Sequence, residues 1–322
     1  MATCAMVTML SSCSDHDASG LLPEHDAACT PMTFTAQQEP FGEETRISYL
    51  EDAGEMEQIF VVAQTGSAST AECSFTDFFY RNDAGIYSTS NPDAAWPNDS
   101  RTEVTFFAIN LGPDWNFLFN ATGKGASPLT DNSVKGIERY DNYFYRDVVA
   151  AYTVTSASKT NGGQVPLTFK HILAEIGINA RGEYDPSYPT ALFRLTQIML
   201  TPIHPLAVYH FDTNTWSNDP DGDDLPEISD IYYFASDGID LNNSGDYQEV
   251  MEPGSASGDY FGFLIPGEYT MTVDYWYDAD GENGPVYDMV SDSKSCTVTL
   301  EQGKKNRINL TLPALDPVLK TW

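Results

Sequence analysis

The sequence predicts an all-β protein, and three observations support this fold class. Apolar and polar residues alternate with a period of two in the stretches 165–169, 269–277, 296–300 and 308–312. This period is typical of strands that are buried on one face. Clusters of Gly, Pro, Asn and Asp interrupt the stretches at short intervals, as they do in β-sandwiches. Helical patterns are sparse, and only the stretch 171–176 indicates a short helical turn.

The alternation also predicts which side chains are buried. Trp96, Phe106, Trp216 and Phe263 are expected to lie in cores and to have no chemical role. His171 follows an apolar strand, so we expect a structural histidine that is hydrogen-bonded and not a metal ligand. The expected inward positions in the alternating stretches are Val165, Leu167, Phe169, Tyr269, Met271, Val273, Tyr275, Tyr277, Cys296, Val298, Leu300, Ile308, Leu310 and Leu312.

The 322 residues are enough for two domains of ordinary size. The stretch 182–189 holds two prolines and a glycine, which interrupt strands and helices alike. We therefore predict one β-sandwich domain over residues 32–185 and a second over 186–322. Residues 14–31 are rich in small and polar side chains and are expected to form a tether.

The chain is strongly acidic. It carries 47 Asp and Glu residues against 16 Lys and Arg, for a formal net charge of −31. Such a surface repels phosphate backbones, so nucleic acid is not expected as a partner. Solubility alone would also explain the charge. Because 41% of the residues are hydrophobic and 12% aromatic, the chain can build packed cores.

Motifs of common enzyme classes are missing from the sequence. It has no G-x-S-x-G elbow, no H-E-x-x-H, no P-loop and no dinucleotide fingerprint. Paired carboxylates are frequent in so acidic a chain, so their spacing does not exclude a glycoside hydrolase. We expect a protein that is not an enzyme, and we keep surface glycan hydrolysis as a minor alternative.

Three acidic turns have the oxygen atoms that calcium prefers, at 219–224, 240–246 and 278–282. In the second turn Gly245 stands where an EF-hand loop turns sharply, but Met251 stands where the bidentate Glu belongs. Acidic turns of this kind also connect ordinary hairpins. We therefore expect no cofactor, and calcium is the metal that these turns leave open.

The N-terminus predicts export. Residues 2–10 form an apolar run without charge, and the run ends in Leu10-Ser11-Ser12-Cys13. An aliphatic residue, two small residues and a cysteine match the bacterial lipobox. We predict a lipoprotein signal peptide over residues 1–13, with Cys13 carrying the lipid (palmitate is a typical acyl chain) that anchors the chain to a membrane. The acidic stretch 14–17 resembles the surface-export signal of some gram-negative lipoproteins.

The five cysteines do not form a C-x-x-C pair, so zinc ribbons and thioredoxin-like motifs have no support. With Cys4 removed and Cys13 lipidated, the remaining three are Cys29, Cys73 and Cys296. One disulfide and one free thiol would fit, and the sequence does not select the pair.

Several stretches resemble motifs of the fimbrillin family, the pilin-like lipoproteins of type V pili. An L-x-F-x-H strand after the D-V-V-A-A stretch is the most specific element. The segment 57–75 departs from the family pattern, which leaves its strand order open. The matching stretches, in family order, are W-P at 96–97, V-T-F-F-A at 104–108, D-V-V-A-A at 147–151, L-T-F-K-H at 167–171, F-D-T-N-T-W at 211–216, F-L-I-P at 263–266 and the closing hairpin at 295–313.

The resemblance implies two transthyretin-like β-sandwich domains in tandem. It implies a lipoprotein exposed on the cell outer membrane and in the fimbrium, which polymerises with other pilus subunits by β-strand exchange and serves adhesion. The main alternative is a surface lipoprotein or tip adhesin that binds host glycan or protein without polymerising. The sequence does not separate shaft, tip and anchor roles.

The resemblance also implies a maturation site. In the family, an arginine- or lysine-specific protease removes the leading strand of the precursor. Residues 33–36 would be that strand, and Arg46 is the first basic residue of the chain, which makes it the expected cleavage site. Arg46 could equally begin an ordinary strand.

Strand exchange needs a donor strand that is extended and alternating. Ile308, Leu310 and Leu312 alternate in this way and would enter the pockets of a neighbouring subunit. The same residues could instead form the last strand of the second domain, an alternative that we slightly favour. The tail from residue 314 would then be an auxiliary contact.

Overall fold

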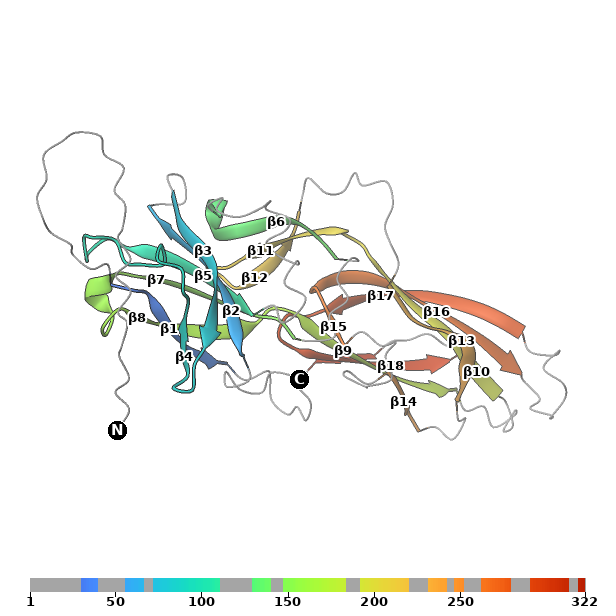
Figure 1. Ribbon diagram of the computed structural model, residues 1–322. Coiled ribbons are helices and arrows are strands. Elements are labelled where there is room, and N and C mark those ends of the chain that lie inside the picture. The colour runs from blue at the N-terminus through green and yellow to red at the C-terminus, as the bar shows by residue number, and fades with distance from the viewer. Residues whose placement is uncertain are drawn as a thin grey trace, which may run out of the picture.

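The computed structural model confirms the all-β class (Figure 1). Within the described part of the chain there is no α-helix, and two 3-10 turns lie at Thr130–Asn132 and Ala157–Lys159. The described residues are 30–39, 56–66, 72–110, 129–139, 147–183, 192–219, 231–241, 246–251, 262–278, 290–312 and 318–321.

The N-terminal half forms a closed barrel around an aromatic core. Phe34, Phe79, Phe106 and Phe169 are completely buried inside it, and Trp96 is 4% exposed. The sequence predicts a sandwich here, but the strands close into a ring because β1 pairs on both of its sides. The strands around the barrel are β1 (Thr33–Gln38), β4 (Ile86–Ser88), β3 (Glu72–Arg81), β2 (Gln58–Thr65), β5 (Val104–Asn110), β7 (Val149–Thr155) and β8 (Gln164–His171).

A small sheet packs on the outside of this barrel. It contains β12 (Thr215–Asn218), β11 (Leu206–His210) and β6 (Ser133–Glu138), in that order. Phe107 of β5 faces this sheet, where its ring contacts Phe211 at 5.2 Å. Strand β5 is therefore buried on both faces, which explains its nearly continuous apolar sequence.

The C-terminal half is a sandwich of two sheets around a single core (Figure 1). The predicted alternation is confirmed in both halves. Val165, Leu167 and Phe169 are buried in the barrel, and Tyr269, Met271, Val273 and Tyr275 are buried in the sandwich. Cys296 and Trp216 are half-buried, and the side chain of Tyr277 lies outside the described residues. One sheet contains β13 (Ile231–Leu241), β10 (Leu192–Pro202), β16 (Gly267–Asp278) and β17 (Val290–Leu300), and the other β14 (Gln248–Met251), β9 (Ala174–Gly182), β18 (Lys305–Leu312) and β19 (Val318–Thr321), with β15 (Phe263–Leu264) pairing with β9.

The segment from His171 to Ile176 joins the two halves, and its predicted helical turn is wrong. His171 ends β8 and Ala174 begins β9, so the chain passes from strand to strand within two residues. Ile172 and Leu173 are buried between the barrel and the small sheet, whereas Ile176 is buried in the sandwich. A helical turn would place Leu173 and Ile176 on one side, but the two side chains enter different cores.

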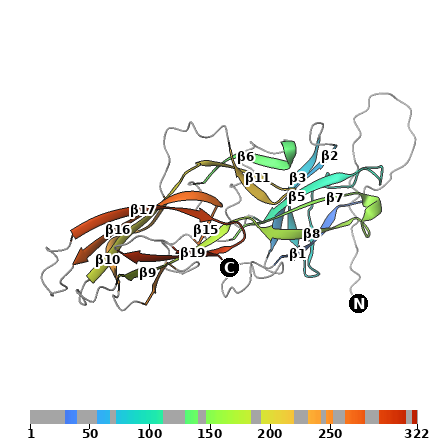
Figure 2. The same cartoon turned by 180° about the vertical axis from the view of Figure 1, so that it is seen from behind.

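Strand pairing crosses the predicted domain boundary at residues 185 and 186. Strand β9 precedes it, yet β9 lies in the C-terminal sandwich and pairs with β18 in parallel. Strand β11 follows it, yet β11 pairs with β6 beside the barrel. The boundary itself and the transthyretin-like type of the two units stay predictions. Figure 2 shows, from behind, the barrel and the sandwich at opposite ends of an elongated molecule.

Candidate assembly site

Strand β1 is the expected leading strand, and it closes the barrel. It pairs in parallel with β8 over six residues, from Thr33 opposite Gln164 to Gln38 opposite Phe169. On its other side it pairs antiparallel with β4, where Phe34 lies opposite Tyr87. A strand between two partners satisfies its own backbone groups and those of both neighbours.

The side chain of Phe34 anchors β1 in the barrel core. It is completely buried. Its ring meets Phe79 edge-on at 4.7 Å and Phe106 at 5.4 Å. A ring in such a pocket contributes several kcal/mol through area burial and edge-to-face contacts.

The Trp-Pro motif holds the start of β1. The backbone N–H of Trp96 donates to the carbonyl of Thr30 at 3.0 Å, and Met32 N donates to Ala94 O at 3.0 Å. The indole Nε1 of Trp96 donates to the carbonyl of Gly163 at 3.0 Å. Gly163 has φ of +84°, and a Cβ there would lie 3.1 Å from Trp96 Nε1, so the close approach favours glycine.

The two most specific family motifs meet at the other end of β1. His171, from L-T-F-K-H, contacts the carboxylate Oδ2 of Asp147, from D-V-V-A-A, through its Nδ1. Its Nε2 lies 3.1 Å from the carbonyl oxygen of Glu39, directly after β1. The prediction of a structural, hydrogen-bonded histidine is confirmed, and burial raises the pKa of Asp147.

The predicted exchange residues lie inside their own sandwich. Ile308, Leu310 and Leu312 of β18 are completely buried in the C-terminal core. β18 pairs with β9 on one side and with β19 on the other. β19 is the end strand of this sheet and pairs with the four residues Asn306–Asn309.

Other predicted site residues lie outside the described part of the chain. These are Cys13, Arg46, Cys29 and the side chain of Cys73, so lipidation and cleavage stay predictions. Cys296 is a free thiol, and burial raises its pKa to about 11. None of the described helices has the length and apolarity to cross a membrane.

The three acidic turns fall largely outside the described residues as well. Asp240, at the start of the second turn, forms an ion pair with Arg194 at 2.6 Å. Among the residues that the structure describes, no three His, Cys, Asp or Glu side chains come together as a metal site. The expectation of no cofactor, with calcium left open by these turns, stays a prediction.

The buried guanidinium of Arg139 is a feature that the sequence patterns miss. Arg139 directly follows β6 and is 1% exposed. It donates to carbonyl groups of segments that lie about 65 and 127 residues further along the chain. An isolated arginine after a strand carries no local signal for this role.

The chain is an all-β protein in two halves. Its first strand closes a barrel, and the barrel is joined to a two-sheet sandwich. The family model described as fimbrillin-like matches residues 45–321, and the chain belongs to this family. The resemblance found in the sequence motifs is thereby confirmed.

Solved structures share this fold at low sequence identity. A fimbrial protein from Bacteroides vulgatus has a TM-score of 0.53 and 14% identity, covering 90% of this chain and 98% of that chain. A protein from Parabacteroides distasonis, described as a candidate cell adhesion protein, has a TM-score of 0.54 and 10% identity, covering 90% and 91%. No curated protein sequence matches.

Proposed function

We propose that this protein is an adhesive pilus subunit of the bacterial cell surface and that its copies assemble by exchange of a β-strand. Family membership supports this function. The observation that carries it is the place of β1, a six-residue first strand that closes the barrel between β4 and β8. The proposed role is structural and involves no catalysis.

Release of β1 would create an acceptor groove. The backbone groups of β4 and β8 that pair with β1 would lose their partners, and the pocket of Phe34 would be empty. Unpaired strand edges beside an apolar groove bind an incoming strand. Arg46 lies in the segment that joins β1 to β2, so cleavage there would separate β1 while every later strand stays on one chain.

We propose the C-terminal tail from residue 314, with β19, as the donor. β18 has partner strands on both sides, and its side chains Ile308, Leu310 and Leu312 fill their own core. Removing β18 would therefore open the sandwich. β19 has a partner only along β18 in the described sheet, so it can leave at a smaller loss of contacts.

We propose that the precursor reaches the outer membrane as a lipoprotein through Cys13. Its support is the lipobox at residues 10–13. Cys13→Ala, expressed with a complete signal peptide, should lose acyl labelling and leave the membrane fraction. Acyl labelling that persists in this variant would contradict the anchor.

Cleavage and exchange are tested together in cells that display the protein. The wild-type surface form should begin at Ile47 and form filaments in negative-stain microscopy. Arg46→Ala should keep the intact N-terminus and form no filaments, whereas Arg101→Ala, at an exposed position, should behave as wild type. Deletion of 314–322 should give a cleaved, folded monomer. Normal filaments from both the Arg46 variant and the deletion would overturn the proposed assembly.

A further inference from the structure

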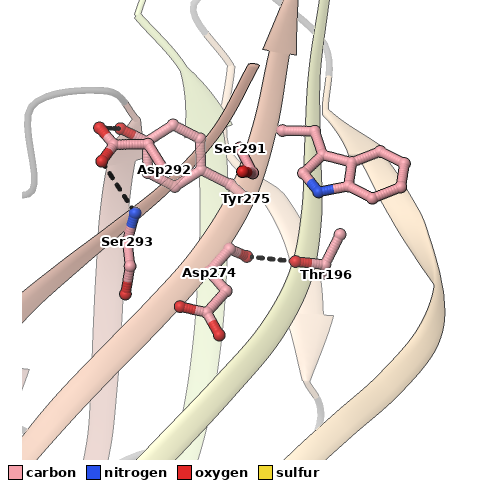
Figure 3. Close-up of a pocket in the computed structure, with 7 residues that line it drawn as sticks. Thr196, Asp274, Tyr275, Ser291, Asp292 and Ser293 are labelled. Atoms are coloured by element: carbon pink, nitrogen blue, oxygen red, sulfur yellow. Dashed lines mark hydrogen bonds between the residues drawn. The ribbon is translucent and has the colours of Figure 1, made fainter. Parts of the chain in front are cut away.

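The outward face of the four-stranded sheet carries a hollow of about 470 Å³ between β10, β16 and β17 (Figure 3). Thr196, residues 274–276 and residues 291–293 line it. Small-molecule sites commonly have volumes of this order and combine an aromatic surface with a few polar groups. The strands around the hollow belong to a different sheet from β1 and from β19.

Trp276 is an aromatic side chain on the outward face of the sheet and not on the face that covers the core. The alternate positions Val273 and Tyr275 point into the core, whereas Trp276 points outward and is 37% exposed. Its neighbour across the strand pair with β17 is Ser291, whose small side chain leaves the indole open on that side. The exposed face of this indole is a flat apolar surface on which a ligand ring can stack.

Free hydrogen-bonding groups lie beside this indole. Asp274 is two residues along the same strand and face, about 7 Å away. Its carboxylate makes no hydrogen bond or ion pair with the described residues, and Figure 3 shows that Thr196 bonds instead to the backbone carbonyl of Asp274, at 2.9 Å. Ser291 and Ser293 are exposed next to it on β17.

Asp292 also borders the hollow, but it pairs with Tyr275 in the register of β16 and β17, so its carboxylate lies on the face of Tyr275 and not beside Trp276. Asp292 accepts hydrogen bonds from the Tyr275 hydroxyl and from the backbone N–H of Ser293, both at 2.9 Å. Lys294 lies 3.1 Å from it. The Lys294 ammonium, followed by these two donors, lowers the pKa of Asp292. These bonds hold Asp292 beside Tyr275, so Asp274 is the carboxylate that can accept hydrogen bonds next to Trp276.

We propose that this hollow binds a neutral glycan, with one pyranose ring stacked on Trp276 and the hydroxyls of the next sugar donating to Asp274. The C–H groups on one face of a pyranose are weakly positive and match the negative face of the indole. Vicinal sugar hydroxyls suit a free carboxylate acceptor. The net charge of −31 and the carboxylate of Asp274 repel sialylated, sulfated and uronic acid glycans.

The test uses the purified full chain on an array of neutral, sialylated and sulfated oligosaccharides. The neutral oligosaccharide with the strongest signal is then titrated by calorimetry. Trp276→Ala should weaken its binding about tenfold or more, and Trp276→Phe should restore most of it. Asp274→Asn should also weaken binding. The matched control is Tyr80→Ala, which removes an aromatic ring that is 57% exposed on the barrel and should change nothing.

We expect every variant to be folded, because all the changes are at partly exposed positions. A cooperative thermal unfolding transition for each variant checks this. An array without neutral ligands, or with acidic ligands alone, would overturn the proposal, and so would equal affinity of wild type and Trp276→Ala. Filaments lost in Trp276→Ala, without glycan binding by wild type, would assign this face to a contact between subunits. Loss of filaments in the Arg46 variant would leave the glycan result unaffected, so the two proposals fail separately.

Discussion

Arg139 joins the two halves of the molecule through its hydrogen bonds. The guanidinium donates to the carbonyl of His204 at 2.6 Å, to that of Pro266 at 3.2 Å and to Oδ1 of Asn218 at 3.0 Å. Gly267 packs against it with φ of +151°, and a Cβ there would lie 2.9 Å from the guanidinium carbon. Burial lowers the pKa of Arg139, but five donors with several acceptors keep the charged form satisfied.

We expect Arg139→Ala to lower the free energy of unfolding by about 3 kcal/mol or more. The change leaves buried carbonyl groups without donors and opens a cavity between β6 and β16. Urea unfolding followed by circular dichroism measures the loss. Arg101→Ala, at an exposed loop position, should change the value by less than about 0.5 kcal/mol. Equal effects of the two substitutions would contradict the joining role of Arg139.

Glu175 makes stability depend on pH. Its carboxylate is 3.4 Å from Nζ of Lys305, and the side chain is 3% exposed. Burial raises the pKa of Glu175 to about 7 although Lys305 acts in the opposite direction. A raised pKa in the folded state means that the unfolded chain loses this proton first as the pH rises.

We expect the free energy of unfolding to fall between about pH 4.5 and pH 7 because of Glu175. Its stabilising contribution is fully present below the unfolded pKa and is lost as the pH rises through the folded pKa. From the two pKa values the loss is about 3 kcal/mol. Urea unfolding at a series of pH values, with Glu175→Gln beside wild type, isolates this part. Curves of identical slope for both proteins would contradict it.

At the scale of elements, β1 has more effect on the fold than its six residues suggest. Its removal would open the barrel, and its sequence places Phe34 in the middle of the barrel core. Trp96 at one end and His171 at the other fix its position. Because β1 is held at its two ends and by the ring of Phe34, we expect the whole strand to leave the barrel together once these contacts are lost.

Phe34→Ala should lower the free energy of unfolding of the intact chain by about 3–5 kcal/mol, because it leaves a cavity among Phe79 and Phe106. Guanidinium unfolding measures this loss. Thr35→Ala, on the same strand with a partly exposed side chain, should cost about 1 kcal/mol or less. A Phe34→Ala chain as stable as wild type would show that β1 is not anchored by its ring.

Strand β9 ties the ends of the C-terminal half together. Eight of its residues pair in parallel with Lys305–Leu312, at a separation of about 130 residues along the chain. We expect this pairing to form late in folding, since closing so long a loop is unfavourable before the core forms. Folding of the C-terminal sandwich therefore depends on β18, near the end of the chain.

At the scale of the whole molecule, the barrel and the sandwich lie at opposite ends of an elongated body (Figures 1 and 2), and the described residues form three cores. One of these cores lies between barrel and small sheet and includes residues from both halves, among them Phe107, Phe211 and Phe263. The full chain carries a formal net charge of −31. Like charges on one folded molecule repel each other and reduce its stability at low salt.

The melting temperature should therefore rise by a few degrees between 10 mM and 300 mM NaCl, because salt screens the repulsion. Differential scanning fluorimetry at constant pH measures this change. An uncharged osmolyte at equal osmolality serves as the control and should not reproduce the salt dependence in this range. A melting temperature that falls with NaCl would contradict net repulsion.

The sequence by itself determined the strands and their inward faces. Val165, Leu167 and Phe169, or Ile308, Leu310 and Leu312, alternate with polar residues, and each of these six is buried. This works because the side-chain period of a strand is a local property that burial of one face imposes on the sequence. The family motifs likewise marked His171 and Asp147 before their contact was known.

Only the tertiary structure decided which strands are partners. β1 pairs with β8 across about 130 residues, β9 belongs to the C-terminal sheet, and Arg139 finds acceptors on distant segments. The apolar spacing of the stretch 171–176 suits a helical turn, but Leu173 and Ile176 enter separate cores. Alternation predicts that a strand has a buried face. Which core covers that face depends on contacts between residues that are remote along the chain, and a local sequence period cannot predict such contacts.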